Sequence, residues 1–372
     1  MYGAQLIEAL RLEFSEAMDF FGVGGDKMRA AGCDTVVDAK DLAVVGITEI
    51  VGQLPKIWKL FHYLINEADR RKPDLAIIID SPGFNWRVAR EMKRRGVPVV
   101  YYVCPQFWAW RQGRVKLLRD YVDKALVIFP FEEKFYRDRG VDAEFVGHPL
   151  ADLSRPEISR EQYANDFELD ISKPWITLMP GSRRKEVRMN LRGILASAAM
   201  LGDGFEFLLP VAPTLDADYF HQFLIAAREV RERVHLVPEA LPALAHSRAG
   251  IIASGTATVE AALMELPFVM VYRVTGLTYL LGRSTVKVPH FAMVNLIAGE
   301  QVVPELVQQD FTPERVLAEV NKILPNCQPR EKMLRGLGTV KTRLNAPTAG
   351  MSAPARAAAA VRKLLRVGEL RR

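Results

Sequence analysis

Short apolar segments alternate with longer amphipathic segments along the first half of the chain. The run 75–79 is continuously apolar, which is typical of a parallel strand buried on both faces. Amphipathic patterns at 54–70 and 85–95 predict helices between the strands. Strands are predicted at 19–23, 75–80, 97–103, 125–129 and 144–146. Strands and helices in alternation predict an α/β domain with a parallel sheet.

A second series of the same kind follows a polar connector at 151–173. Its strands are predicted at 175–179, 205–210, 234–236, 250–253 and 268–274. Two such series predict two Rossmann-like, doubly wound domains that face one another across a cleft. We expect the first domain at 1–165 and the second at 170–350. A helix rich in Ala, Arg and Lys within 351–372 is expected to pack back on the first domain.

The chain opens with an amphipathic pattern in which Leu6, Ile7 and Leu10 share one face. An α/β domain normally begins with a strand whose loop leads into such a helix. Two interpretations are open, a genuine helical start or a start downstream of a first strand, and we favour the second.

Composition adds little about partners. The chain has 372 residues, of which 49% are hydrophobic, and a net charge of +6. That charge is compatible with nucleic acid, an anionic membrane or phosphorylated substrates, and chooses none of them. No apolar run reaches the roughly 18 residues of a membrane-spanning helix. Cys33, Cys104 and Cys327 are far apart, so we expect reduced cytosolic thiols, not disulfides or a zinc site.

Two strand ends in the second half favour anion binding. Gly181-Ser182-Arg183 follows one strand and precedes a helix, where backbone N–H groups and a forked guanidinium suit a phosphate. Ser254-Gly255-Thr256 follows another strand, and Glu260 one turn later could accept hydrogen bonds from a ribose. Each segment alone could be an ordinary strand–helix turn. Together they favour a nucleoside diphosphate.

Candidate residues in the first half also follow strands. Asp80 could act as a general base or could cap the next helix. Trp108, Trp110 and Arg111 could form a wall for an apolar or sugar ligand, or the tryptophans could belong to the core. His148, alone between Gly147 and Pro149, is more often a structural residue than a catalytic one.

The segment 268–288 combines apolar residues with Arg283 and Lys287. Such a surface would suit the face of an anionic membrane, although a buried helix is the more common explanation. No His, Asp or Glu cluster at metal spacing is apparent in the sequence. We therefore predict no metal and no cofactor.

Several of these segments, in this order, resemble the lipid-A-disaccharide synthase family of GT-B glycosyltransferases. The run Phe-Trp-Ala-Trp-Arg and the turn Ser-Gly-Thr-Ala-x-x-Glu are specific in combination and weak separately. The matching stretches span nearly the whole chain and are 79–85, 104–111, 145–149, 179–183, 253–260, 271–273 and 294–298.

The resemblance implies an inverting transfer from UDP-2,3-diacylglucosamine to 2,3-diacylglucosamine 1-phosphate, which releases UDP. It implies that Asp80 is the catalytic base. It assigns acceptor binding to Asn85, Trp108, Trp110, Arg111 and His148. It assigns nucleotide binding to Gly181, Ser182, Arg183, Ser254, Gly255, Thr256, Glu260, Arg273 and Asn295. A cytoplasmic protein peripheral to the inner membrane of a Gram-negative cell is implied, and a homodimer is left open.

The resemblance also implies a first strand and a Gly-Glu-x-Ser-Gly-Asp loop before residue 2, which the sequence lacks. Their absence would affect acceptor binding or catalysis. Two rivals stay open, another GT-B enzyme that uses a UDP-sugar, such as a peptidoglycan N-acetylglucosaminyltransferase or an epimerase, and an inactive nucleotide-binding protein. A nucleic-acid role is disfavoured because the basic residues are scattered.

Overall fold

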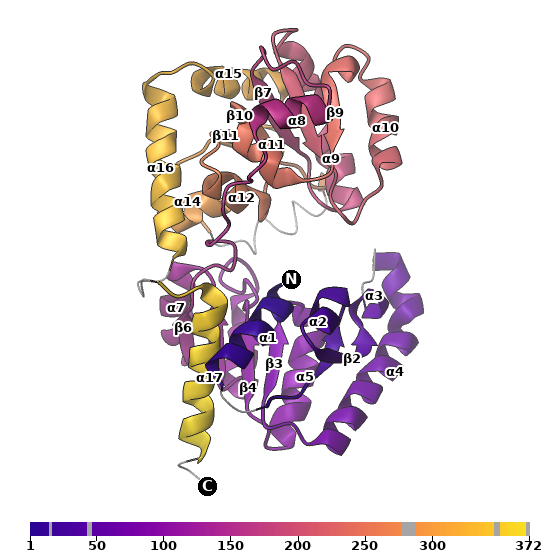
Figure 1. Cartoon of the computed structure of the whole chain (residues 1–372), viewed down its shortest axis with the longest axis vertical. Helices are drawn as coiled ribbons and strands as arrows, with labels where there is room; N and C mark the ends of the chain where they lie inside the picture. The colour runs from indigo at the N-terminus through magenta and orange to yellow at the C-terminus, as the bar shows by residue number, and fades with distance from the viewer. Residues whose placement is uncertain (15–16, 43–46, 277–287, 346–349, 370–372) are drawn as a thin grey trace. The chain divides into compact units, whose positions relative to one another are not determined.

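A computed structural model describes residues 1–14, 17–42, 47–276, 288–345 and 350–369, with side chains except in 47–53 and 367–369. The chain divides into two compact units (Figure 1). The first comprises Met1–Asp152 and Leu344–Arg372, and the second comprises Leu153–Arg343.

The first unit contains a four-stranded parallel sheet in the order β3-β4-β5-β6 and a two-stranded parallel sheet β1-β2. All four side chains of β4 are buried, as its Val-Val-Tyr-Tyr sequence favours. The strands expected in this half are confirmed, with ends that differ by one or two residues. β2 was missed because its Cys-Asp-Thr-Val-Val-Asp sequence is polar and only partly buried. The bounds are β1 Phe20–Gly24, β2 Cys33–Asp38, β3 Ala76–Ile79, β4 Val99–Tyr102, β5 Lys124–Val127 and β6 Ala143–Phe145.

Helices from both ends of the chain lie together in the first unit. α1 packs along α17, which presents small side chains that allow close approach. The predicted apolar face of α1 is buried, and Arg362 of α17 pairs with Glu13 at 3.0 Å. The helices are α1 Tyr2–Glu13, α2 Asp26–Ala30, α3 Ala39–Leu42, α4 Ile47–Arg71, α5 Pro82–Arg94, α6 Val115–Tyr121, α7 Pro130–Arg137 and α17 Ala353–Glu369.

The second unit is built on a six-stranded parallel sheet in the order β12-β11-β10-β7-β8-β9. The chain starts at the centre with β7, moves outward through β8 and β9, and then returns to build the other side. This is the order of a doubly wound Rossmann-like sheet. The strands are β7 Trp175–Met179, β8 Glu206–Pro210, β9 Val234–Val237, β10 Ala249–Ala253, β11 Phe268–Tyr272 and β12 Glu305–Val307.

Helices follow most strands of this sheet, as the sequence pattern predicts. The three-residue edge strand β12 was missed. The helices are α8 Arg160–Asp166, α9 Arg184–Met200, α10 Ala217–Ala226, α11 Ala240–His246, α12 Ala257–Leu263, α14 Met293–Ala298, α15 Pro313–Ile323 and α16 Gln328–Leu344.

The unit boundary lies at Asp152, earlier than the expected residue 165. The reason is α8, whose Tyr163 and Ala164 pack in one buried cluster with Trp175 and Leu208 of the second sheet. Burial of these apolar side chains assigns the segment to the second unit. The later boundary lies at Leu344 because α16 completes the second unit.

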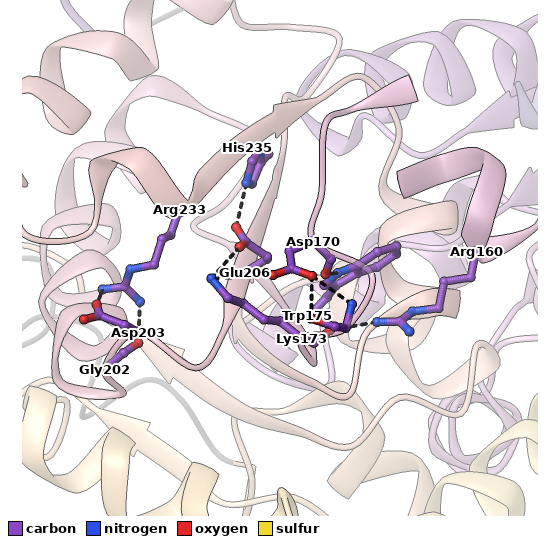
Figure 2. A network of polar contacts seen from close by, with 10 residues as sticks. Arg160, Asp170, Lys173, Trp175, Gly202, Asp203, Glu206, Arg233 and His235 are labelled. Atoms are coloured by element: carbon purple, nitrogen blue, oxygen red, sulfur yellow. Dashed lines mark hydrogen bonds and ion pairs between the residues drawn. The ribbon is translucent and has the colours of Figure 1, made fainter. Parts of the chain in front are cut away.

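A polar network closes the amino-terminal edge of the second sheet (Figure 2). The Glu206 carboxylate is buried and accepts from Lys173 Nζ at 3.1 Å and contacts His235 Nε2 at 2.8 Å. The neighbouring Arg233 pairs with Asp203 at 3.4 Å. These contacts lie at the starts of β7, β8 and β9, the edge opposite to the loops that follow the strands.

None of the helices within the described ranges is long and apolar enough to cross a bilayer. Arg283 and Lys287, which would suit either a membrane face or a buried helix, lie outside the described residues.

Candidate functional site

Two loops of the second unit meet where the strand order reverses. β7 and β10 are hydrogen-bonded neighbours, with Met179 paired to Ile252, although β8 and β9 lie between them in the sequence. The loops that follow these strands carry Gly181–Arg183 and Ser254–Thr256. In doubly wound sheets, ligands bind outside the carboxyl ends of the strands at such a switch point. The fold therefore brings the two predicted anion-binding segments to one place.

Glu186 of the following helix, α9, binds back to the loop after β7. The carboxylate Oε2 accepts from the backbone N–H groups of Ser182 at 3.0 Å and Arg183 at 3.3 Å. Its Oε1 accepts from Arg183 Nη1 at 3.0 Å. The N–H groups expected to be free are thus occupied. The N-cap residue of α9 is Arg183, and Glu186 at the third helical position accepts from its backbone N–H.

Gly181 makes this loop possible. Its φ is +119°, and a Cβ placed there would lie 2.6 Å from Cβ of Glu186. Neighbouring side chains hold the loop on its other sides. Thr214 Oγ1 donates to the Ser182 carbonyl at 2.6 Å, and Tyr219 donates its hydroxyl to the Arg184 carbonyl at 2.9 Å.

Asn190 connects the loop to the end of β11, which lies beyond β10 in the sheet. It is buried, and its amide donates to the carbonyl of Pro180 at 3.1 Å and of Glu186 at 2.9 Å. Its Oδ1 accepts from the backbone N–H of Arg273 at 3.0 Å. The backbone of this part of the loop is therefore preorganised.

The loop after β10 is more open. Gly255 has φ +149° and no atom near its missing Cβ, and both Gly255 and Thr256 are exposed. Ser254 Oγ donates to the Phe291 carbonyl at 2.9 Å. Burial raises the pKa of Glu260, which lies half-buried on α12. This loop offers a backbone that a ligand can approach closely.

Arg273 and Asn295 are engaged in contacts within the second unit. Arg273 donates to the carbonyls of Gln308 and Phe311. Asn295 is buried, donates to Val303 and Glu305, and accepts from two backbone N–H groups. An amide side chain has two donor hydrogens and two acceptor positions, so Asn295 has no capacity left in this conformation. It ties α14 to β12.

Asp80 of the first unit lies in a strained turn at the carboxyl end of β3. Asp80 and Ser81 have φ values of +48° and +42°, which non-glycine residues rarely adopt. The Asp80 carbonyl accepts from the Tyr101 hydroxyl at 2.7 Å and from Asn85 Nδ2 at 2.6 Å. Asn85 also donates to the Ile79 carbonyl at 2.8 Å. Two non-glycine residues in this region, both supported by buried or half-buried neighbours, are typical of a functional turn.

The capping alternative for Asp80 is wrong, because Ser81 is the N-cap residue of α5. The helix begins at Pro82, earlier than the predicted residue 85. The Asp80 carboxylate is exposed and makes no hydrogen bond to another described residue.

The aromatic loop divides into a buried part and an exposed part. Trp108 is 5% exposed and donates its indole N–H to Glu132 Oε1 at 2.8 Å, so it belongs to the core. Trp110 is 46% exposed, and the Arg111 guanidinium lies 4.3 Å from its ring centroid. Only this second pair is placed to meet a ligand from solvent.

Glu132 holds the buried part of the aromatic loop in place through hydrogen bonds. Its Oε2 accepts from the backbone N–H groups of Ile128 and Phe129 at the start of α7. Burial raises the pKa of this carboxyl to about 7.

His148 is fully buried against the ring of Phe129. Its Nδ1 accepts from the Leu150 N–H at 3.1 Å, so the neutral imidazole carries its hydrogen on Nε2. Nε2 has no partner among the described residues. Burial lowers the pKa of His148 to about 4, which keeps the ring neutral.

Sequence reasoning missed four residues that organise the two sites, namely Tyr101, Glu132, Glu186 and Asn190. Glu132 and Glu186 had a usable signal, since a glutamate three residues after a helix N-cap typically bonds back to the cap N–H. In the described ranges no group of three His, Cys, Asp or Glu side chains could hold a metal ion.

Comparisons with known proteins agree on family and fold. A family model described as lipid-A-disaccharide synthetase matches residues 1–357. The lipid-A-disaccharide synthase of Koribacter versatilis is 52% identical over 361 residues, which cover 97% of this chain and 94% of the relative.

Two solved structures share the fold at low identity. The UDP-GlcNAc 2-epimerase of Neisseria meningitidis, bound to UDP-GlcNAc, matches with a TM-score of 0.63 at 12% identity over 98% of this chain and 95% of its own. The calicheamicin glycosyltransferase CalG4 matches with a TM-score of 0.59 at 17% identity over 98% and 94%. The predicted fold class, two Rossmann-like domains of the GT-B type, is confirmed.

Proposed function

Because the chain belongs to the lipid-A-disaccharide synthase family and is a glycosyltransferase of lipid A synthesis, we propose that it joins two specific acylated sugars. The donor is UDP-2,3-diacylglucosamine and the acceptor is 2,3-diacylglucosamine 1-phosphate. The acceptor hydroxyl displaces UDP from the opposite face of the donor sugar, which inverts that carbon and gives a β-1,6 bond.

The observation that carries the proposal is the convergence of two glycine-containing loops at the switch point between β7 and β10. Backbone N–H groups, the N-terminus of the 17-residue helix α9 and Arg183 lie there. Negative charge grows on the diphosphate as UDP leaves, and such groups stabilise that charge without a metal. The solved epimerase with bound UDP-GlcNAc supports the same ligand class for this fold. Glu260 faces the ribose in this proposal.

Asp80 is the proposed base that removes the proton from the acceptor hydroxyl. Its carboxylate is exposed at a strand end, while the backbone that carries it is fixed by Tyr101 and Asn85. A base acts efficiently when its position is fixed and its oxygen atoms stay accessible.

Trp110 and Arg111 are the proposed contacts for the acceptor, since an exposed indole packs on a sugar face and a guanidinium pairs with a phosphate. Trp108 and His148 would act from behind this surface, because both are buried. Asn85 would act through Asp80, because both of its amide hydrogens are used.

We also propose a cytoplasmic protein in peripheral contact with an anionic membrane, where acylated substrates reside. A net charge of +6 supports attraction to such a surface. Analytical ultracentrifugation distinguishes a monomer from the homodimer left open above.

The test is a product assay with both acylated substrates, analysed by mass spectrometry, beside a parallel assay with non-acylated analogues. We expect a disaccharide 1-phosphate and UDP from the acylated pair only, with the same rate in EDTA. Asp80→Ala is expected to abolish turnover and to leave the Kd for UDP within about twofold, since the base does not touch the nucleotide. A loss of activity in EDTA would overturn the metal-free assignment, and retained turnover in Asp80→Ala would overturn the base.

A further inference from the structure

We infer that Glu186 is an internal anion that occupies the diphosphate position and must leave it when the nucleotide binds. This inference rests on the proposed function, because it concerns the site assigned above to UDP. It gives Glu186 a role that opposes nucleotide affinity.

The contacts of Glu186 occupy three donors of the β7 loop. One carboxylate accepts from the N–H groups of Ser182 and Arg183 and from the Arg183 guanidinium, at 3.0 to 3.3 Å. These are the groups that a phosphate would use. Two anions cannot both bond fully to the same two backbone N–H groups, and like charges at such short range repel each other. Nucleotide binding at this loop therefore requires the carboxylate to move.

Glu186 is able to move. Its side chain is 33% exposed and its partner Arg183 is 82% exposed. The backbone of the loop is fixed independently of Glu186, by Thr214, Tyr219 and Asn190. Departure of the carboxylate would therefore leave the N–H groups in place for a ligand.

Glu132 is an example of a permanent helix cap in the same chain. It occupies the corresponding position on α7 and also accepts from two backbone N–H groups, at 3.1 and 3.0 Å. Its side chain, however, is fully buried and is held by the Trp108 indole. Glu186 lies instead at the switch point of a doubly wound sheet, where a ligand is expected. The same local contact is thus fixed in one unit and replaceable in the other.

The direction in which removal of Glu186 changes nucleotide affinity can be measured. A carboxylate that only shapes the loop would strengthen nucleotide binding, so its removal would weaken affinity. A carboxylate that competes with the diphosphate would weaken binding, so its removal would strengthen affinity. The expected gain corresponds to one N-cap interaction, about threefold to tenfold in Kd.

The experiment is calorimetric titration of the full chain with UDP and, separately, with uridine. Glu186→Gln keeps the size of the side chain and removes its charge, and Glu186→Ala removes the group. Glu232→Gln removes the same charge from an exposed position at the opposite edge of the sheet and serves as the matched control. Thermal unfolding of each variant verifies folding, and the isosteric Gln variant retains an oxygen for the loop.

We expect UDP to bind Glu186→Gln and Glu186→Ala about threefold to tenfold more tightly than the unchanged chain, with uridine affinity and Glu232→Gln unaltered. UDP binding by Glu186→Ala where the unchanged chain shows none would support the inference equally. Unchanged or weaker UDP affinity in both variants would overturn it and leave the proposed function standing. Absence of UDP binding in every variant and in the unchanged chain would overturn both.

Discussion

The turn at the end of β3 can be tested through Asn85, which we expect to position Asp80 without touching the acceptor. Asn85→Ala removes the bonds to the Ile79 and Asp80 carbonyls and leaves the Asp80 carbonyl with the Tyr101 hydroxyl. Each lost hydrogen bond contributes about 1 kcal/mol to the stability of the turn, so the substitution removes roughly 2 kcal/mol of stabilisation. The left-handed conformations of Asp80 and Ser81 cost about 1 to 2 kcal/mol each. The lost support is therefore comparable to the strain, and the turn should relax.

Relaxation moves the base and leaves the binding groups in place. We expect kcat to fall about 10- to 100-fold, because small displacements of a reacting group have effects of this size. The KM for the acceptor should stay within about twofold. Steady-state kinetics with both substrates gives the two constants, and urea unfolding gives the accompanying loss of up to about 2 kcal/mol.

Asn326→Ala is the matched control, because it deletes another amide that bonds to its neighbour, Arg248, at 2.5 Å in the second unit. It should change stability without changing kcat. If Asn85→Ala raised the acceptor KM tenfold at unchanged kcat, Asn85 would be a direct ligand of the acceptor and the positioning role would be refuted.

Two further predictions concern buried carboxylates. Glu206→Gln should lower the free energy of unfolding by about 1 to 3 kcal/mol, because Lys173 and His235 lose a buried charged partner. Denaturant unfolding measures this loss. A change in UDP affinity would contradict the placement of the network at the edge opposite to the nucleotide site. The pKa of Glu132 is raised from 4.5 to about 7, so the folded chain holds this proton more tightly than the unfolded chain. Stability should therefore fall by roughly 1 to 3 kcal/mol as pH rises from about 5 to 8. Glu132→Gln should flatten that slope in denaturation at several pH values, and an unchanged slope would exclude Glu132 as its source.

The strands could be predicted from sequence where burial makes them continuously apolar. β7 was predicted to the residue, because Trp175–Met179 is buried along almost its whole length. β2 was missed because it is partly polar, and the short edge strand β12 was missed although the equally short β6 was predicted. Pattern alone does not mark strands that are stabilised mainly by their neighbours.

Site residues were predictable where backbone geometry requires a residue type. Gly181 and Gly255 belong to this class, because both have positive φ. The partners that hold a site were not predictable. Tyr101 reaches Asp80 from 21 positions away, and Trp108 reaches Glu132 from 24 positions away. No local pattern records such a contact, and an aromatic run does not tell which ring turns inward.

The two candidate sites rest on different physical grounds and can therefore fail separately. In the second unit, strand order alone locates the ligand, since β7 and β10 flank the only reversal among the described strands of that sheet. In the four-stranded sheet of the first unit, the described strands follow one another in sequence order, and no reversal marks a site. There the signal is conformational strain at Asp80, which is maintained by two hydrogen bonds to its carbonyl. Strain that costs stability is retained where it fixes a functional group. A variant that relaxes this turn should thus impair transfer while UDP still binds, and a variant of the β7 loop should alter UDP affinity while the turn at Asp80 stays intact.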